Sequence, residues 1–163
     1  MSKDCPGEAT KQSKHSPGKV SNSETLFYVL IEPHNYQQND ISSRAFSRSE
    51  LTDSQVSVSR KQHTPKEILQ KEVIDVLLQK DPRRNAIGVL QADCVKVRSL
   101  KTDAPQNRRV FCVIDDGTLK NPGHAHLGFS EVTKLQPKNY KTAHRANLIL
   151  LFGDERCLDD VYN

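Results

Sequence analysis

The stretch TLFYVLI, residues 25–31, is the first part of the chain that has the composition of a folded core. It is rich in β-branched and aromatic side chains, and Pro33 follows it, so it predicts a buried strand. The preceding residues, 1–24, hold four lysines, many serines and two Pro-Gly pairs, with no apolar cluster. Such a segment cannot bury enough surface to offset its ordering entropy, so we expect a disordered basic tail there.

Residues 64–80 carry the clearest helix signal in the chain. Thr64, Pro65 and Glu67 stand in the order of a capping box, with Thr64 at the N-cap and proline at the first helical position. Pro82 cannot continue the helix and ends it. The apolar residues between these points are spaced three and four apart and predict one buried stripe, formed by Ile68, Leu69, Val73, Val76 and Leu77.

Three further strands complete the expected sheet. Residues 55–60 alternate between valine and polar side chains, which predicts a half-buried strand. Residues 86–100 predict a longer strand with a bulge near Ala92, because the parity of the apolar residues changes there. Residues 109–115 are almost continuously apolar, which predicts a central strand covered on both faces.

The order of elements predicts an α+β fold. Residues 140–152 favour a second helix closed by Gly153, with a strand over residues 146–152 as the competing prediction. We therefore expect a small, mainly antiparallel sheet with two helices packed on one face. One domain spans residues 25–153, and a short acidic tail occupies residues 154–163.

Charge and cysteine usage limit the classes of function. The net charge of +4 permits nucleic-acid binding but is too small to argue for it. No apolar run is long enough to span a membrane, and residues 1–24 lack the apolar core of a secretory signal. None of the four cysteines has CxxC spacing, so we expect a reducing, cytoplasmic location without disulfides. Cys94 and Cys112 are predicted to be small core residues.

Four short motifs follow one another between residues 26 and 152: SSRAF at 42–46, VSV at 56–58, IGV at 87–89 and NPGHA at 121–125. The succession resembles a group of small uncharacterised bacterial proteins with S-x-A-F, (L/V)-S-V, G-V and N-P-x-H-A segments. The resemblance implies no activity. The chain departs from the pattern at Leu90, where an aromatic residue is usual, and at His126, where an aliphatic one is expected.

The stretch DDGTLKNPGHAHLGF, residues 115–129, holds most of the side chains that could carry chemistry. His124 and His126 share one face of a strand, so both imidazoles could bind one metal ion. Glu131 is a candidate third ligand, with His34, His63 and His144 as alternatives. The competing interpretation is structural: His124 hydrogen-bonds the turn at 121–123, and His126 is exposed at a strand end.

Two other groups of polar residues are candidate sites. Asp115 and Asp116 could act as paired carboxylates, but adjacent residues of a strand point to opposite faces, so only one can face a given site. Arg44, Arg48 and Arg60 lie near several serines and could bind a phosphate group through their guanidinium groups. Neither a P-loop nor a GxGxxG motif is present, which excludes nucleotide binding of the familiar kinds.

These observations favour a cytoplasmic, non-enzymatic interaction module whose partner is another protein, with no cofactor, metal or membrane. One alternative is a ligand- or metal-binding, enzyme-like domain centred on His124 and His126, with His124, Arg44 and Asp116 as candidate catalytic residues. A second alternative is a weak nucleic-acid binder. A pocket on which His124, Arg44 and Asp116 converge would favour the enzyme-like domain.

Overall fold

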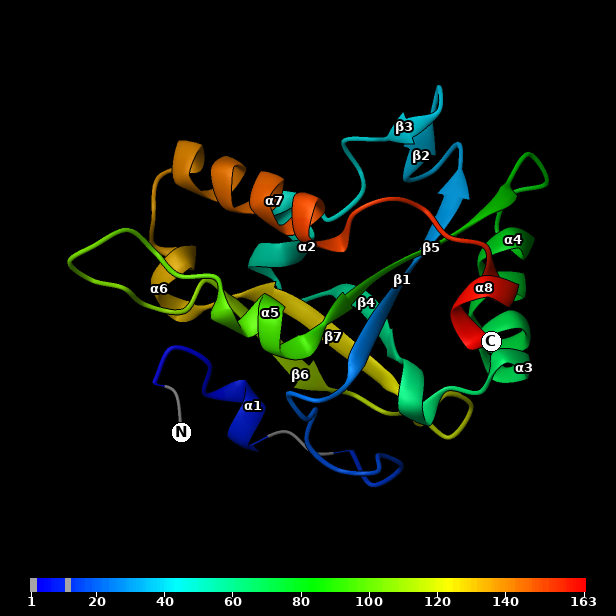
Figure 1. Cartoon of the computed structure of the whole chain (residues 1–163), viewed down its shortest axis with the longest axis horizontal. Coiled ribbons are helices and arrows are strands. Elements are labelled where there is room, and N and C mark those ends of the chain that lie inside the picture. Colours follow the sequence, from blue (N-terminus) through cyan, green and yellow to red (C-terminus); the bar gives the residue numbers. More distant parts are fainter. Residues whose placement is uncertain (1–2, 11–12) are drawn as a thin grey trace.

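The computed structural model of the chain describes residues 3–10 and 13–163. At its centre lies a five-stranded antiparallel sheet in the order β5-β1-β4-β7-β6 (Figure 1). This sheet confirms the expected α+β class, and a small separate hairpin joins β2 (Tyr36–Gln37) to β3 (Asp40–Ile41). The strands of the main sheet are β1 (Thr25–Glu32), β4 (Val56–Arg60), β5 (Asn85–Asp93), β6 (Phe111–Asp115) and β7 (His124–Phe129).

Strand β1 divides the core into two layers. Its alternate residues Leu26, Tyr28 and Leu30 join one apolar cluster, while Phe27, Val29 and Ile31 join another on the opposite face. The first face is covered by α2 (Arg48–Thr52), α5 (Cys94–Ser99) and α7 (Lys138–Phe152). The second is covered by the helical segment α3 (Lys66–Ile68), η2 (Leu69–Ile74) and α4 (Asp75–Gln79), and by α8 (Leu158–Tyr162).

The two longest helical segments therefore lie on opposite faces of the sheet, so their predicted placement on one face is wrong. The fold is still of the α+β class. Helices cover both faces of the sheet because β1 has apolar side chains on both faces. Helix α7 itself is confirmed, and Gly153 ends it with φ 73°. Short turns complete the chain: α1 (Gly7–Thr10), the 3₁₀ turn η1 (Lys61–His63) and α6 (Glu131–Lys134).

The helical segment that follows β4 has a π-helical middle. The expected capping box does not form, because Pro65 is the N-cap residue and the Thr64 hydroxyl donates instead to Asn121 Oδ1, 3.0 Å away. A π turn inserts one extra residue and rotates the helix surface that follows it. As a result Ile74 is buried, with 4% exposure, while Val76, which the predicted stripe included, is 44% exposed.

Two strand predictions need correction. Strand β5 ends at Asp93, and the chain turns directly into α5, so the change of parity near Ala92 marks a strand-to-helix junction instead of a bulge. Strand β6 lies at the edge of the sheet, not at its centre. Its apolar side chains are still covered on both faces, by the main core on one side and by the N-terminal segment on the other.

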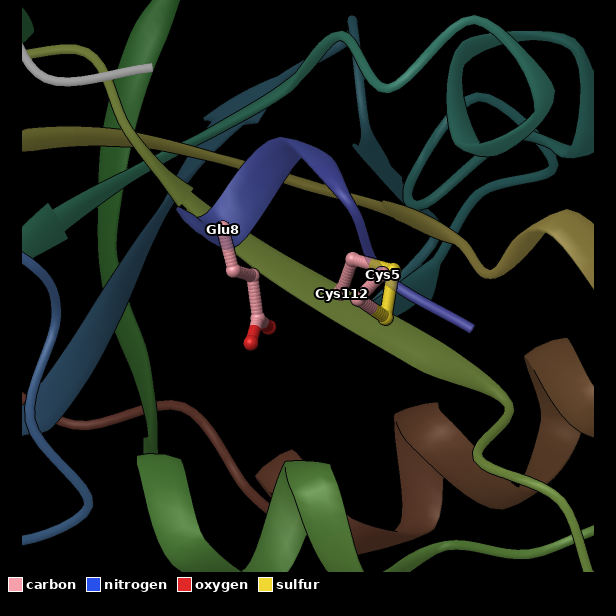
Figure 2. Close-up of side chains that lie close together, drawn as sticks. All are labelled: Cys5, Glu8 and Cys112. Carbon is pink, nitrogen blue, oxygen red and sulfur yellow. A yellow bond between two sulfur atoms is a disulfide. The ribbon is translucent and has the colours of Figure 1, made fainter. Parts of the chain in front are cut away.

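The described part of the N-terminal segment is docked, so the expected disordered tail over residues 1–24 is wrong. Cys5 forms a disulfide with Cys112 of β6, with 5.5 Å between the two Cα atoms (Figure 2). The Glu8 carboxylate pairs with Arg98 at 3.3 Å and Arg109 at 2.5 Å and accepts the Val113 amide at 2.8 Å. Ion pairs and a disulfide bond thus hold the segment against β6, although the segment has little apolar surface to bury.

The residues after Gly153 also belong to the fold. Arg156 exchanges two main-chain hydrogen bonds with Val89 of β5, at 3.0 and 2.9 Å. Val161 of α8 is buried in the second apolar cluster. The acidic stretch 154–163 is therefore a covering element of the second face. In the described ranges, no helix combines the length and apolarity needed to cross a bilayer.

Candidate functional site

A polar patch lies on the second face of the sheet, between its two covers. Ser57 and Ser59 of β4 stand directly opposite His126 and His124 of β7. Residues paired across antiparallel strands share a face, so all four side chains belong to one surface. The helical segment covers β1 on one side of this patch, and the N-terminal segment covers β6 on the other. The two histidines remain partly open, with 20% and 29% side-chain exposure.

Asp116 completes this patch from the neighbouring strand. Its main-chain N–H donates to the His124 carbonyl, 3.1 Å away, which extends the β6–β7 pairing by one step. Its Oδ2 atom lies 3.4 Å from His124 Nδ1 and 3.6 Å from His126 Nδ1. One ligand atom from each of the three residues falls within 4.8 Å of the others. Asp116 therefore occupies the third position that sequence reasoning gave to Glu131.

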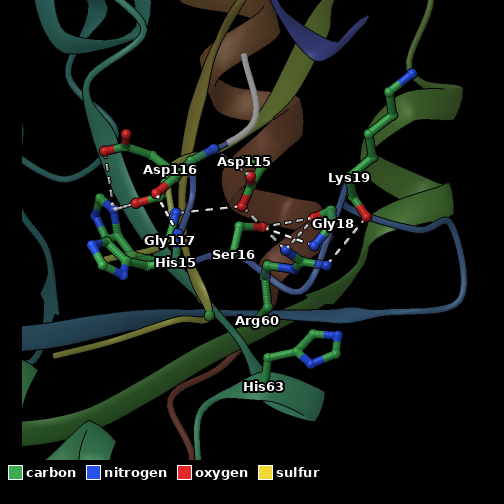
Figure 3. A network of polar contacts seen from close by, with 12 residues as sticks. His15, Ser16, Gly18, Lys19, Arg60, His63, Asp115, Asp116 and Gly117 are labelled. Atoms are coloured by element: carbon green, nitrogen blue, oxygen red, sulfur yellow. Dashed lines mark hydrogen bonds and ion pairs between the residues drawn. The ribbon is translucent and has the colours of Figure 1, made fainter. Parts of the chain in front are cut away.

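The neighbouring carboxylate, Asp115, points away from the patch. It is buried, and its Oδ1 atom pairs with Arg60 Nη1 at 3.3 Å. Arg60 also binds the Glu24 carboxylate at 2.6 and 2.7 Å. Figure 3 shows its further contacts with the main-chain oxygens of Gly18 and Lys19. The expectation that only one of the two aspartates faces a given site is confirmed.

Arg60 is thus a structural residue, and its assignment as a phosphate ligand is wrong because only 1% of its side chain is exposed. Burial raises the pKa of Glu24, but its hydrogen bonds with Arg60 and with the Ser21 amide outweigh that effect and lower the pKa below its ordinary value. Glu24 therefore stays ionised beside Arg60. This buried network fixes the end of β6 from which Asp116 projects.

A tight turn places His124 at the start of β7. Asn121 Oδ1 accepts hydrogen bonds from the Gly123 amide and the Thr64 hydroxyl, while its Nδ2 donates to Ser59 Oγ. A side chain at position 123 would collide with Thr64 Oγ1, so glycine is required there. The His124 ring does not bond this turn: its Nδ1 lies 3.1 Å from the Asp116 carbonyl oxygen. The predicted hydrogen bond of His124 with the turn is made by its main-chain amide, which donates to the Asn121 carbonyl oxygen at 3.0 Å, while its ring contacts Asp116.

A groove of about 240 Å³ runs from the polar patch along the same face. Its floor is formed by β1 and β4, and Val73 and Leu77 form a wall. His124 lines one end, and His34 and Lys80 line the other. The strand positions from Ser59 to Gln55 cover roughly 13 Å at about 3.3 Å per residue, so the groove could hold an extended small molecule.

The remaining candidates do not join the patch. Glu131 begins α6 and pairs with Lys134 at 3.1 Å, outside the cluster of donor atoms. His63 Nε2 lies 3.8 Å from Glu24 Oε1. His144 of α7, on the first face, is hydrogen-bonded through Nε2 to Gln136 Oε1 at 2.9 Å. Arg44 lines a different hollow, so the convergence of His124, Arg44 and Asp116 is not found.

A second cluster of potential metal ligands brings Cys5, Glu8 and Cys112 together. The two sulfur atoms are already joined as a disulfide, and Figure 2 shows the Glu8 carboxylate beside them. Because that carboxylate is bound by two arginines and a main-chain amide, this cluster is a structural cross-link. Sequence reasoning missed the pairing because the cysteines are 107 residues apart and have no diagnostic spacing.

Comparison with known proteins finds no matching family model, no matching curated protein and no matching solved structure. The resemblance to small bacterial proteins therefore stays a prediction.

Proposed function

We propose that this protein binds a divalent transition metal ion at Asp116, His124 and His126. One observation carries the proposal: the Asp116 Oδ2 atom lies 3.4 and 3.6 Å from the two histidine nitrogens. Two ligands that are each about 2.0–2.1 Å from a tetrahedral ion are roughly 3.3–3.4 Å apart. Both distances to Asp116 are therefore close to the spacing that zinc needs, and a ligand nitrogen of each histidine lies within 4.8 Å of that of the other.

The ligand set favours an enzyme-like site over a purely structural one. Structural zinc sites in proteins use four protein ligands, whereas catalytic sites use three and leave a position for water or substrate. Two histidines and one carboxylate also suit ferrous iron and manganese, so zinc is the first choice among several. The open side of the patch faces solvent and the end of the groove, where a bound molecule could reach the ion.

Metal binding would rearrange the hydrogen bonds of the patch. His124 Nδ1 contacts the Asp116 carbonyl oxygen, and it can serve as a ligand only without a proton. A metal ion therefore competes with protons for this nitrogen, and binding weakens as the pH falls. The tight turn at 121–123 limits the movement of the His124 main chain, so the adjustment falls on the side chains.

Titration with Co²⁺ and Zn²⁺ tests the proposal. The wild-type protein should bind one equivalent of Co²⁺ and develop the visible absorption of a tetrahedral site, and one equivalent of Zn²⁺ should displace it. His124→Ala, His126→Ala and Asp116→Asn should each weaken Zn²⁺ binding at least about 100-fold, because each removes one of three ligands. His144→Ala, on the opposite face, is the matched control and should bind like the wild type.

The outcome against the proposal is equally definite. If His126→Ala and Asp116→Asn bind Zn²⁺ as tightly as the control, the three residues form no metal site. The polar patch would then be a hydrogen-bonded surface, in which Asp116 orients two imidazoles. The non-enzymatic interaction module favoured by the sequence would in that case become the leading proposal, with nucleic-acid binding behind it.

A further inference from the structure

A second polar site lies at the far end of the groove, around His34. This residue follows β1 and lines both the groove and an adjoining hollow of about 310 Å³. The hollow is formed by the turn after β1 and the loop that leads to α2, and it includes Ser42, Ser43 and Arg44. His34 Nδ1 is buried yet has no hydrogen-bond partner among the described residues. A buried polar atom without a partner is costly, which suggests that a ligand supplies one.

The surroundings of His34 are positively charged. Burial lowers the pKa of His34, and the charges of Arg84, Arg44 and Lys80 lower it further. The described residues provide no ion-pair partner for the Arg44 guanidinium, which is exposed at the mouth of the hollow. Arg83 also lines the hollow, but its charge is offset by Asp81 at 2.7 Å, an interaction that lowers the Asp81 pKa to about 2. The positive charge at His34 therefore comes from Arg44, Lys80 and Arg84, while Glu50 is a carboxylate that lines the adjoining groove.

The loop that carries Arg44 is held in place. The Ser42 hydroxyl donates to the His34 carbonyl oxygen at 3.0 Å and accepts the Arg44 amide at 3.2 Å. Arg44 and His34 are thus tied to each other through one serine. The neighbouring Ser43 hydroxyl has no partner among the described residues and can donate to a ligand.

We propose that this hollow binds the phosphoryl group of a small phosphate monoester, whose body lies along the groove towards His124. A phosphoryl dianion offers three acceptor oxygens, which match a guanidinium fork, an imidazole N–H and a hydroxyl. The groove then receives the uncharged part of the molecule against Val29, Val73 and Leu77. Of the arginines that the sequence singled out for phosphate binding, the structure retains Arg44 and leaves out Arg48 and Arg60.

Calorimetric titration with inorganic phosphate and with phenyl phosphate at low ionic strength tests this inference. Both should bind, and phenyl phosphate should bind more tightly because its ring reaches the apolar part of the groove. Arg44→Gln and His34→Ala should each weaken binding at least about tenfold. Arg48→Gln removes the same charge from the next helix, outside the lining of the hollow, and should leave binding unchanged within about twofold.

Three results would overturn the inference: equal losses in Arg44→Gln and Arg48→Gln, acetate binding as tightly as phosphate, or no binding of either phosphate probe. Tighter binding of a short DNA strand than of phenyl phosphate, falling steeply with salt, would also count against it and favour a nucleic-acid surface. The inference does not rest on the metal site. His126→Ala should retain phosphate binding, so the two proposals can fail separately.

Discussion

Arg60 shows how one buried charge can organise a polar site. The residue sits at the end of β4, where the alternating pattern of residues 55–60 predicts only a half-buried strand. In the fold its guanidinium joins Glu24 of the N-terminal segment to Asp115 of β6, and all three side chains are at most 7% exposed. Two buried carboxylates around one arginine are stable only as a set, because any member left alone would be an unpaired buried charge.

Removing Arg60 should therefore be one of the most damaging single changes in this chain. Arg60→Ala leaves the carboxylates of Glu24 and Asp115 without their shared partner, and we expect a loss of about 3–5 kcal/mol in the free energy of unfolding. Urea denaturation followed by circular dichroism measures this loss. Arg48→Ala, at a partly exposed position, should change stability by no more than about 0.5 kcal/mol.

A comparable stability for the two variants would mean that the buried network contributes little. Arg60→Met gives a second reading, because it keeps the length and apolar volume of the side chain while removing its charge. We expect Arg60→Met to be nearly as destabilising as Arg60→Ala, because both leave the carboxylates of Glu24 and Asp115 buried without a positively charged partner.

Among the secondary-structure elements, the sequence predicted those whose signals are local. The apolar run 25–31 and the segment closed by Gly153 became β1 and α7, because strand composition and a C-cap glycine act within a few residues. The place of β6 in the sheet and the side on which each helix packs were predicted wrongly. These features depend on pairing between distant segments, which apolar periodicity does not report.

In the candidate site, too, the sequence predicts the local features and misses the contacts between distant segments. The two histidines on one face followed from their spacing of two residues on a strand. The sequence marks Asp116 as a candidate catalytic residue, but it does not predict the contact of Asp116 with both imidazole rings, because that contact depends on the pairing of β6 with β7. The sequence offers His34 only as an alternative metal ligand, and nothing in its immediate sequence indicates a buried nitrogen without a hydrogen-bond partner.

The π turn in the helical segment gives a prediction that separates the structure from the simple periodic pattern. Ile74→Ala should cost about 2–5 kcal/mol, because it truncates a side chain that is 96% buried against β1. Val76→Ala should cost less than about 1 kcal/mol, since Val76 lies on the exposed side. Chemical denaturation of both variants measures the difference. A larger loss for Val76→Ala would indicate a regular α-helix without the π turn.

The N-terminal segment packs against β6 and completes the fold of the whole molecule. Sequence composition predicts that this segment stays disordered, because it has little apolar surface to bury. A polar segment can also dock through ion pairs and a disulfide bond, which composition does not report. Asp4 pairs with Arg108, Glu8 binds two arginines, and Cys5 is joined to Cys112 across 107 residues. The segment covers the outer face of β6 and supplies Glu24 to the buried network, so the end of β6 that carries Asp116 depends on it.

The disulfide should therefore contribute strongly to global stability. Closing a loop of about 100 residues removes entropy from the unfolded chain worth up to about 4.7 kcal/mol, and loss of a native disulfide typically costs about 2–5 kcal/mol. We expect Cys5→Ser to lower the free energy of unfolding by that amount, and deletion of residues 1–22 to lower it at least as much. Cys157→Ser, at an exposed free cysteine, is the matched control and should be nearly neutral.

Reduction of the wild-type protein gives the same comparison without a substitution. Denaturation in the presence of dithiothreitol should bring the wild type to the stability of Cys5→Ser and leave Cys5→Ser itself unchanged. If Cys5→Ser and the deletion both unfold at the wild-type midpoint, the segment does not dock. The prediction of a disordered tail from composition would then be correct. If only the deletion is destabilised, the ion pairs of Asp4 and Glu8 and the contacts of Gly18 and Lys19 with Arg60 hold the segment without help from the disulfide.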